Sequence, residues 1–195
     1  MSTLLQIGCN LGDEKIFNLI IENKIKNVYL IDANPKSLAV CKSNITDFLS
    51  SKNIDFHLKV IFINCAISNS DEKTLKFYVP HDDRHSAHAS LKIEQISDLK
   101  SDSIEVDNYK LDSLLDSLNI SEVDYLIIDT EGCDKEILSS IMWGKRKIKN
   151  LTFEFTHWDG YNRYISPHLN SFLFFLLMQG YKLKKTSALD ITASL

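Results

Sequence analysis

Short apolar runs that alternate with helix-like segments constrain the fold of this chain more than any other feature. The runs occupy residues 4–7, 28–31, 58–65, 125–129 and 148–155. Runs of this length are typical of strands that are buried on both faces of a parallel sheet. Helices of about 10–15 residues between such strands require right-handed crossovers. We therefore expect an α/β fold with a mostly parallel sheet and helices on both of its faces.

The segments between these runs carry apolar residues at helical spacing. Asp13 is expected to cap the first helix, and Pro35 is expected to begin the second, which reaches about Ser50. A third helix is expected over residues 111–118. Gly144 and Gly180 are expected to end the last two helices, because glycine readily adopts the backbone conformation that follows a helix.

The alternation is interrupted between residues 70 and 108. Residues 73–79 and 104–106 have the composition of additional strands, and the polar stretch 81–90 between them is expected to be a loop. Two short strands, 181–184 and 189–195, are expected to complete the chain. We predict one domain over residues 1–195, in which residues 70–108 form an inserted strand-loop-strand region that covers the site.

Charge and apolar content exclude several classes of protein. The net charge of −4 provides no attraction to phosphate backbones, so we expect no nucleic-acid partner. The longest apolar run, residues 172–178, is far shorter than the roughly 20 residues of a membrane span. The four cysteines lie far apart and lack metal-binding or redox spacing, so we expect them to be reduced. A cytoplasmic protein is therefore predicted, and its oligomeric state is left open.

Polar residues follow the predicted strands at the edge where parallel sheets bind ligands. The loop 8–12 contains Gly8, Asn10 and Gly12. A dinucleotide fingerprint would need glycines at Asn10 and Asp13, whereas the observed spacing matches the first motif of S-adenosylmethionine-dependent methyltransferases. A tight turn without a ligand is the alternative.

Asp32 ends the second run, where an acid can accept hydrogen bonds from ribose hydroxyls. Its position favours a ligand of the adenosine type, although proteins that bind NAD use an acid in the same way. The alternative is that Asp32 caps the helix that begins at Pro35.

These loops resemble the FkbM-type methyltransferases. In chain order, the similarity is carried by residues 8–12 (GCNLG), 32–35 (DANP) with Asn44, 64–68 (NCAIS), 111–114 (LDSL) and 123–132 (VDYLIIDTEG). The resemblance implies a class I methyltransferase (Rossmann-like) fold, with a seven-stranded sheet whose last strand is antiparallel. It also implies methyl transfer from S-adenosylmethionine, commonly to a hydroxyl of a sugar, glycolipid or polyketide.

The resemblance and the strand-end rule together give a set of candidate cofactor-binding residues. They are Gln6, Gly8, Cys9, Asn10, Gly12, Asp32, Ala33, Asn64, Ala66 and Asp129. Gln6, Ile127 and Asp134 stand where the family usually has an acid, a lysine and a glutamate, respectively. The differences at Gln6 and Ile127 motivate an alternative, a degenerate binding module without turnover. The glycine loop and Asp32 alone motivate a second one, a nicotinamide-dependent oxidoreductase.

Methyl transfer needs a group that takes the proton of the acceptor. We predict Asp129 and Glu131 as catalytic carboxylates, with Asp129 as the first choice for the base. The alternative is that Asp129 caps the helix that starts near Cys133 while Glu131 is solvated. His157 is a further candidate base, because its ordinary pKa lies near neutrality, although a structural role is as compatible with its position.

The acceptor is expected to be a small molecule or a glycan. Ser90, in the polar loop, and Glu154 and Trp158, after the strand 148–155, are the candidate substrate-binding residues. We predict no metal site, because the cluster His81, Asp82, Asp83, His85 and His88 has no fixed ligand geometry. The basic residues Lys145, Arg146, Lys147 and Lys149 are interpreted as a solvated helix cap rather than an RNA-binding patch.

Overall fold

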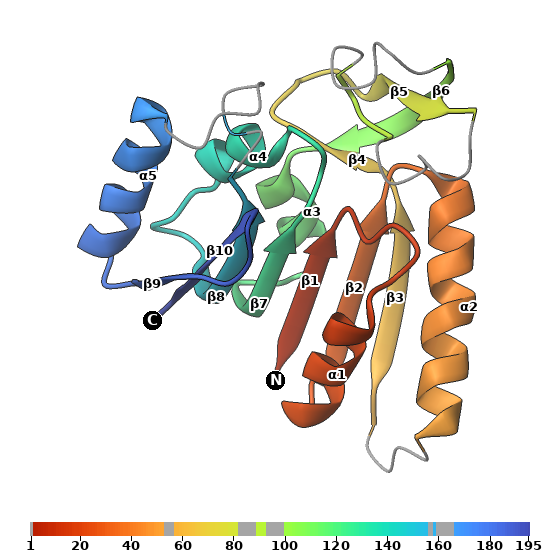
Figure 1. Ribbon diagram of the computed structural model, residues 1–195, viewed down its shortest axis with the longest axis horizontal. Coiled ribbons are helices and arrows are strands. Elements are labelled where there is room, and N and C mark those ends of the chain that lie inside the picture. The colour runs from red at the N-terminus through yellow and green to blue at the C-terminus, as the bar shows by residue number, and fades with distance from the viewer. Residues whose placement is uncertain (1, 53–56, 82–88, 93–99, 156–157, 159–165) are drawn as a thin grey trace.

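The computed structural model describes residues 2–52, 57–81, 89–92, 100–155, 158 and 166–195, and its main feature is a seven-stranded sheet (Figure 1). The strand order is β3-β2-β1-β7-β8-β10-β9. The seven strands are β1 (Thr3–Ile7), β2 (Asn27–Asp32), β3 (Lys59–Asn64), β7 (Glu122–Ile128), β8 (Lys147–Glu154), β9 (Lys182–Lys185) and β10 (Asp190–Ser194). Only β10 runs against its neighbours, since it pairs antiparallel with both β8 and β9. This confirms the mostly parallel sheet with an antiparallel last strand.

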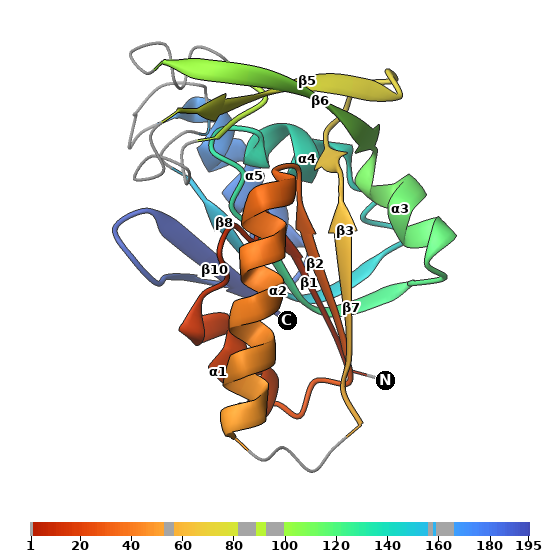
Figure 2. The ribbon, with the colours of Figure 1, turned by 90° about the vertical axis from the view of Figure 1, so that its right-hand side faces the viewer.

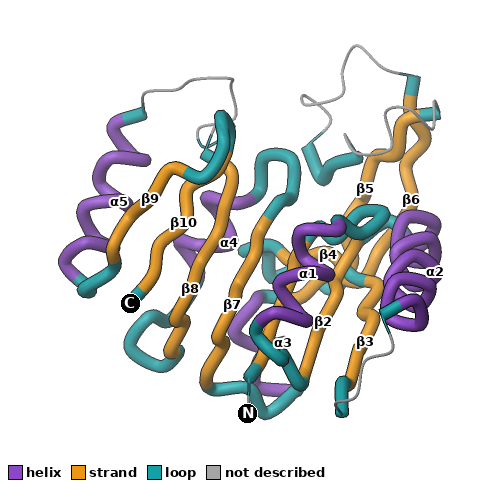
Figure 3. Tube along the Cα trace, turned by 60° about the horizontal axis from the view of Figure 1, so that its bottom comes forward, coloured by secondary structure: helices purple, strands orange, loops and turns teal. Residues whose placement is uncertain are grey.

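Within the described residues, five helices cover the two faces of this sheet. They are α1 (Glu14–Glu22), α2 (Pro35–Ser51), α3 (Leu111–Ser117), α4 (Asp134–Ser140) and α5 (Pro167–Met178). Alternate residues of each strand face opposite sides, so Leu4 packs with α1 and α2, whereas Leu5 packs with the core below α3, α4 and α5. Figure 3 shows the two groups of helices on either side of the strands.

A second, three-stranded sheet is formed by β4 (Ala66–Ile67), β5 (Thr74–Pro80) and β6 (Ser101–Tyr109), in the order β4-β6-β5. The β6 strand is nine residues long and pairs antiparallel with the whole of β5. The strand expected over residues 104–106 is therefore shorter than the observed strand β6. Polar residues on the open face of β6 interrupt the apolar pattern, so the sequence does not show the full length of this strand. The small sheet lies across the carboxyl ends of β1, β2 and β3 (Figure 2).

Two other expectations for local structure are wrong. The α4 helix ends at Ser140 and not at Gly144, because Ile141 has an extended backbone and the Met142 N–H donates to the Asp112 carboxylate at 2.7 Å. Arg146 is not part of a solvated cap, since its side chain is only 3% exposed. Its guanidinium instead donates to the carboxylates of Asp112 and Asp116 at 2.5 Å and 2.6 Å.

Candidate active site

The glycine loop after β1 comes into direct contact with the end of β7. Gly8 has a φ of +78°, and a Cβ at this position would lie 1.8 Å from the carbonyl oxygen of Asp129. The Asp129 N–H in turn donates to the Ile7 carbonyl at 3.0 Å. A side chain at Gly8 would therefore separate two loops whose close approach forms the site.

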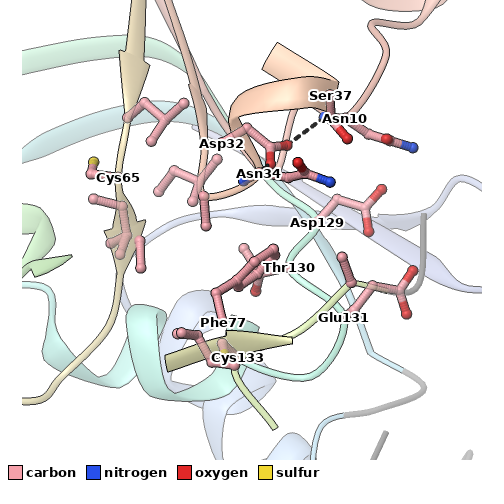
Figure 4. A pocket seen from close by; sticks show the side chains of 18 residues that line it. Asn10, Asp32, Asn34, Ser37, Cys65, Phe77, Asp129, Thr130, Glu131 and Cys133 are labelled. Atoms are coloured by element: carbon pink, nitrogen blue, oxygen red, sulfur yellow. Dashed lines mark hydrogen bonds between the residues drawn. The ribbon is translucent and has the colours of Figure 1, made fainter. Parts of the chain in front are cut away.

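Asp32 orders the backbone of two loops at the end of β2. Its carboxylate accepts from the Asn10 N–H at 2.7 Å and from the Asn34 N–H at 2.8 Å, and the residue is buried (Figure 4). Burial raises the pKa of Asp32, and the two N–H groups oppose that rise. The helix cap is not Asp32 but Asn34, whose side chain accepts from the Lys36 N–H. The proposed cap role for Asp32 is therefore wrong.

The first pocket lies between the two sheets. Gly8, Asn10, Asp32, Ala33, Ala66 and Asp129 line it, so six predicted cofactor-binding residues meet there. Asn64 does not line this pocket. Its side-chain amide donates to the carbonyls of Asp32 and Ala33, and it thereby supports the turn that follows β2. This position differs from the direct ligand contact that we expected for Asn64.

A second pocket lies on the other side of the glycine loop. Its lining includes Gln6, Cys9 and Gly12, and Gly8, Asn10 and Asp129 line both pockets. Two buried oxygens, Gln6 Oε1 and Asn10 Oδ1, have no hydrogen-bond partner among the described residues. Leaving a buried acceptor unpaired is costly, so the geometry fits a ligand that supplies N–H or O–H donors at this loop.

Asp129 follows β7 and opens into both pockets. Withdrawal from bulk water raises the pKa of Asp129 to about 7, and the negative charges of Asp134 and Glu131 add to this rise. Glu131 and Gly132 both have left-handed backbones, with φ of +48° and +101°. Figure 4 shows the side chains of Asp129 and Glu131 pointing to the same side of the pocket. The N-cap of α4 is Cys133, so the expectation that Asp129 might cap this helix is wrong.

Asp134 is a buried carboxylate that connects the ends of β7 and β8. It accepts from the N–H and the hydroxyl of Thr130 at 3.0 and 2.5 Å, and from the Glu154 N–H at 3.0 Å. Burial raises the pKa of Asp134 to about 6. In the sequence, Asp134 is notable only as a departure from the family pattern, because nothing local indicates a partner twenty residues away.

The three predicted substrate-binding residues lie in different surroundings. Ser90 is fully buried, and its hydroxyl donates to the Glu131 carbonyl at 3.0 Å. Glu154 is buried at the end of β8. Trp158 is only 3% exposed and packs on Phe153 and Phe172, so its indole belongs to the core and not to the substrate-binding surface that we expected. His157 lies outside the described residues.

Several pocket residues were not predicted from the sequence. Ser37 and Phe77 line the first pocket, and Thr152 and Asp190 line the second. The alternation of Leu75, Phe77 and Val79 in β5 was the available signal for an inward-facing Phe77. Asp190 is far from the other residues in the sequence, and the pairing of β10 with β8 brings it opposite Glu154.

Metal-ligand clusters and membrane-spanning helices are both absent from the described residues. In that part of the chain no group of three or more His, Cys, Asp or Glu side chains could hold a metal ion. Only His81 of the predicted histidine and aspartate cluster lies within it, and its imidazole pairs with Asp102 at 3.0 Å. None of the described helices is long and apolar enough to span a bilayer.

The strand order, the antiparallel β10 and a glycine loop after β1 define the fold of the class I methyltransferases. The chain belongs to the family of the methyltransferase FkbM domain, whose sequence model matches residues 6–183. This membership indicates S-adenosylmethionine as the cofactor. A comparison with curated protein sequences finds no match.

Solved structures with similar folds have low sequence identity to this chain. TrmK of M. capricolum in complex with S-adenosylhomocysteine is 14% identical, with a TM-score of 0.44, and the alignment covers 99% of this chain and 62% of TrmK. A human methyltransferase 10 domain containing protein is 10% identical, with a TM-score of 0.47 and coverage of 100% and 72%. The N-terminal domain of human METTL16 with S-adenosylhomocysteine is 12% identical, with a TM-score of 0.43 and coverage of 100% and 61%. This chain therefore spans about three fifths of the length of the first and third proteins.

Proposed function

We propose that the protein transfers a methyl group from S-adenosylmethionine to a hydroxyl of a sugar, glycolipid or polyketide-type acceptor. One observation carries this proposal most directly. The unpartnered oxygens of Gln6, in β1, and Asn10, in the glycine loop, belong to residues that line the second pocket together with Asp129. The pKa of Asp129, about 7, suits a base near neutrality. We also place the reaction in the cytoplasm, which the four free cysteines support.

The chain contains groups for each part of such a cofactor. Asp32 has free lone pairs for ribose hydroxyls, and Ala33 and Ala66 provide small side chains beside it in the first pocket. Gln6 Oε1 and Asn10 Oδ1 would accept hydrogen bonds from the ammonium or hydroxyl groups of the cofactor. The bound cofactor supplies the electrophilic methyl group on its sulfonium.

We assign the removal of the acceptor's proton to Asp129. The carboxylate opens into both pockets, and its ionised form would hydrogen-bond the acceptor hydroxyl and take its proton as the C–O bond forms. Glu131, on the same side, would orient the hydroxyl. The inserted region would limit the access of water to the first pocket, since its residues Phe77, Ala89 and Leu91 line that pocket.

The test begins with calorimetric titration of the pure protein with S-adenosylhomocysteine and, in parallel, with NAD. Binding of S-adenosylhomocysteine alone, weakened about tenfold or more in Asp32→Ala, supports the proposal. Asp47→Ala is the control, because Asp47 is exposed on α2 and far from the pocket. Binding of NAD alone would favour the oxidoreductase, for which Asn10 and Asp13 lack the required glycines. If neither compound binds, the proposed function is wrong.

The acceptor is then sought in a panel of glycans and glycolipids, with radiolabelled methyl as the readout. Asp129→Asn is expected to lower the rate by roughly 100-fold or more, the usual contribution of a general base. Cofactor binding without turnover on any acceptor, in a chain whose Gln6 is neutral, would support the degenerate module instead.

A further inference from the structure

The turn that holds the two candidate catalytic carboxylates has an unusual backbone. Glu131 is not glycine, yet its φ of +48° lies in the left-handed region, and Gly132 follows with a φ of +101°. Such a residue persists only where its surroundings hold it, since an ordinary side chain disfavours this conformation. The direction of the Glu131 side chain therefore depends on what fixes these two peptide units.

One short segment of the inserted region contacts both carbonyls of this turn. The Ser90 hydroxyl donates to the Glu131 carbonyl at 3.0 Å, and the Lys92 ammonium donates to the Gly132 carbonyl at 2.7 Å. The Lys92 ammonium also lies 2.9 Å from the Glu136 carboxylate in the first turn of α4. Two adjacent carbonyls are thus held by side chains that are two residues apart.

The segment is itself fixed to the small sheet. Ser90 exchanges two backbone hydrogen bonds with Tyr78 of β5, at 2.9 and 3.1 Å, and its hydroxyl also accepts from the Lys92 N–H. Leu91, between the two side chains, lines the first pocket. The small sheet, the pocket wall and the Glu131–Gly132 turn are therefore connected by three consecutive residues.

We propose that Ser90 and Lys92 are positioning residues, which hold the Glu131–Gly132 turn in its left-handed conformation and thereby set the direction of the Asp129 and Glu131 carboxylates. This inference rests on the proposed function and replaces the direct substrate contact predicted for Ser90. Asp134 holds the preceding residue, Thr130, from the opposite side. The turn is thus restrained from the small sheet and from the core.

The test observes the turn directly in the ligand-free protein. Glu131–Gly132 is the single Glu-Gly pair in the sequence, so labelling with carbonyl-¹³C glutamate and ¹⁵N glycine yields one amide signal, that of Gly132. Lys92→Met keeps the aliphatic chain but removes the donors, and Ser90→Ala removes the hydroxyl. Both are expected to shift or broaden this signal, while Lys92→Arg, which keeps a charged donor, restores it.

Lys76→Met is the matched control, because Lys76 is exposed on β5 and lies opposite Glu105 of β6. Affinity for S-adenosylhomocysteine is expected to fall about tenfold in Lys92→Met and to stay unchanged in Lys76→Met. A Gly132 signal that is unaffected by Lys92→Met and Ser90→Ala would overturn the proposal. So would a uniform change of all glycine signals that Lys92→Arg does not restore, since that indicates only general stability. Because the signal is measured without ligand, a wild-type protein that fails to bind S-adenosylhomocysteine would refute the proposed function and leave this test intact.

Discussion

At the scale of the residue, Asp129 combines access to ligand with a perturbed acidity. Its side chain is exposed to the two pockets, yet four other carboxylates, those of Asp134, Glu131, Glu154 and Asp190, disfavour its charge. A carboxylate with a pKa of about 7 is a stronger base than an ordinary aspartate and is still half ionised at neutral pH. The rate of methyl transfer should therefore rise with pH up to about 7 and then level off.

The raised pKa of Asp129 also leads to a prediction about the stability of the fold. A carboxyl that is protonated more readily in the folded state stabilises the fold at low pH, and this stabilisation is lost as pH rises from about 4 to about 7. Asp129→Asn should remove that loss and raise the free energy of unfolding at pH 8, by less than about 2 kcal/mol because water in the pocket screens the charge. Urea unfolding at pH 4 and pH 8 measures the difference.

Asp47→Asn is the control for this experiment, since Asp47 is exposed and lies away from the acidic residues. An Asp129→Asn variant that is equally less stable at both pH values would contradict the assignment. Such a result would mean that the carboxylate supports the fold through contacts rather than through its charge.

At the scale of the element, a buried ion network fixes α3 against the connection from α4 to β8. The Arg146 guanidinium contacts the Asp112 carboxylate and carbonyl, the Asp116 carboxylate and the Ile120 carbonyl. Asp112 belongs to the LDSL segment that contributed to the family resemblance. The segment's aspartate therefore has a structural role, which keeps α3 in place behind the sheet.

Arg146→Met should lower the free energy of unfolding by about 3 kcal/mol, because it leaves the Asp112 carboxylate, only 13% exposed, without its positively charged partner. Lys145→Met breaks the ion pair between the partly exposed Lys145 and Asp116 and should cost much less, because water screens this pair. Denaturant unfolding of the two variants compares these losses directly. Equal losses would show that Arg146 contributes no more than a surface ion pair.

At the scale of the whole molecule, the first pocket lies between two separate β-sheets. The main sheet contributes Gly8, Asp32 and Asp129, and the inserted region contributes Phe77 and Leu91. A ligand that binds there should contact both. The view of the small sheet across the strand ends in Figure 2 is consistent with this arrangement.

Hydrogen exchange can test this arrangement. At a concentration of S-adenosylhomocysteine about 100 times its Kd, peptides that cover residues 8–12, 75–79 and 89–92 should all exchange more slowly, by up to about 100-fold. Peptides from α3, which lies outside the pocket lining, should not change. Protection of the glycine loop alone would mean that the small sheet takes no part in binding.

Apart from the two-residue strand β4, the sequence alone was sufficient to predict the order of strands and helices along the chain. Burial on both faces leaves continuous apolar runs, and amphipathic helices leave a period of 3.6 residues. The sequence was also sufficient to place Gly8, Asp32 and Asp129 at one edge, because parallel strands end there. Gly8 was predictable for a further reason. A glycine directly after a strand indicates a left-handed backbone, which other residues rarely adopt.

Only the tertiary structure showed which side chains meet across large separations in the chain. The ion pairs of Arg146, the bonds of Asp134 to Thr130 and Glu154, and the contact of Ser90 with Glu131 join residues from different elements. The burial of Trp158 was equally hidden, since an aromatic residue after a strand fits a core and a binding surface alike. Local periodicity records which face of an element is apolar, but the partner of a polar group depends on how distant segments pack, and that packing decides the geometry of this site.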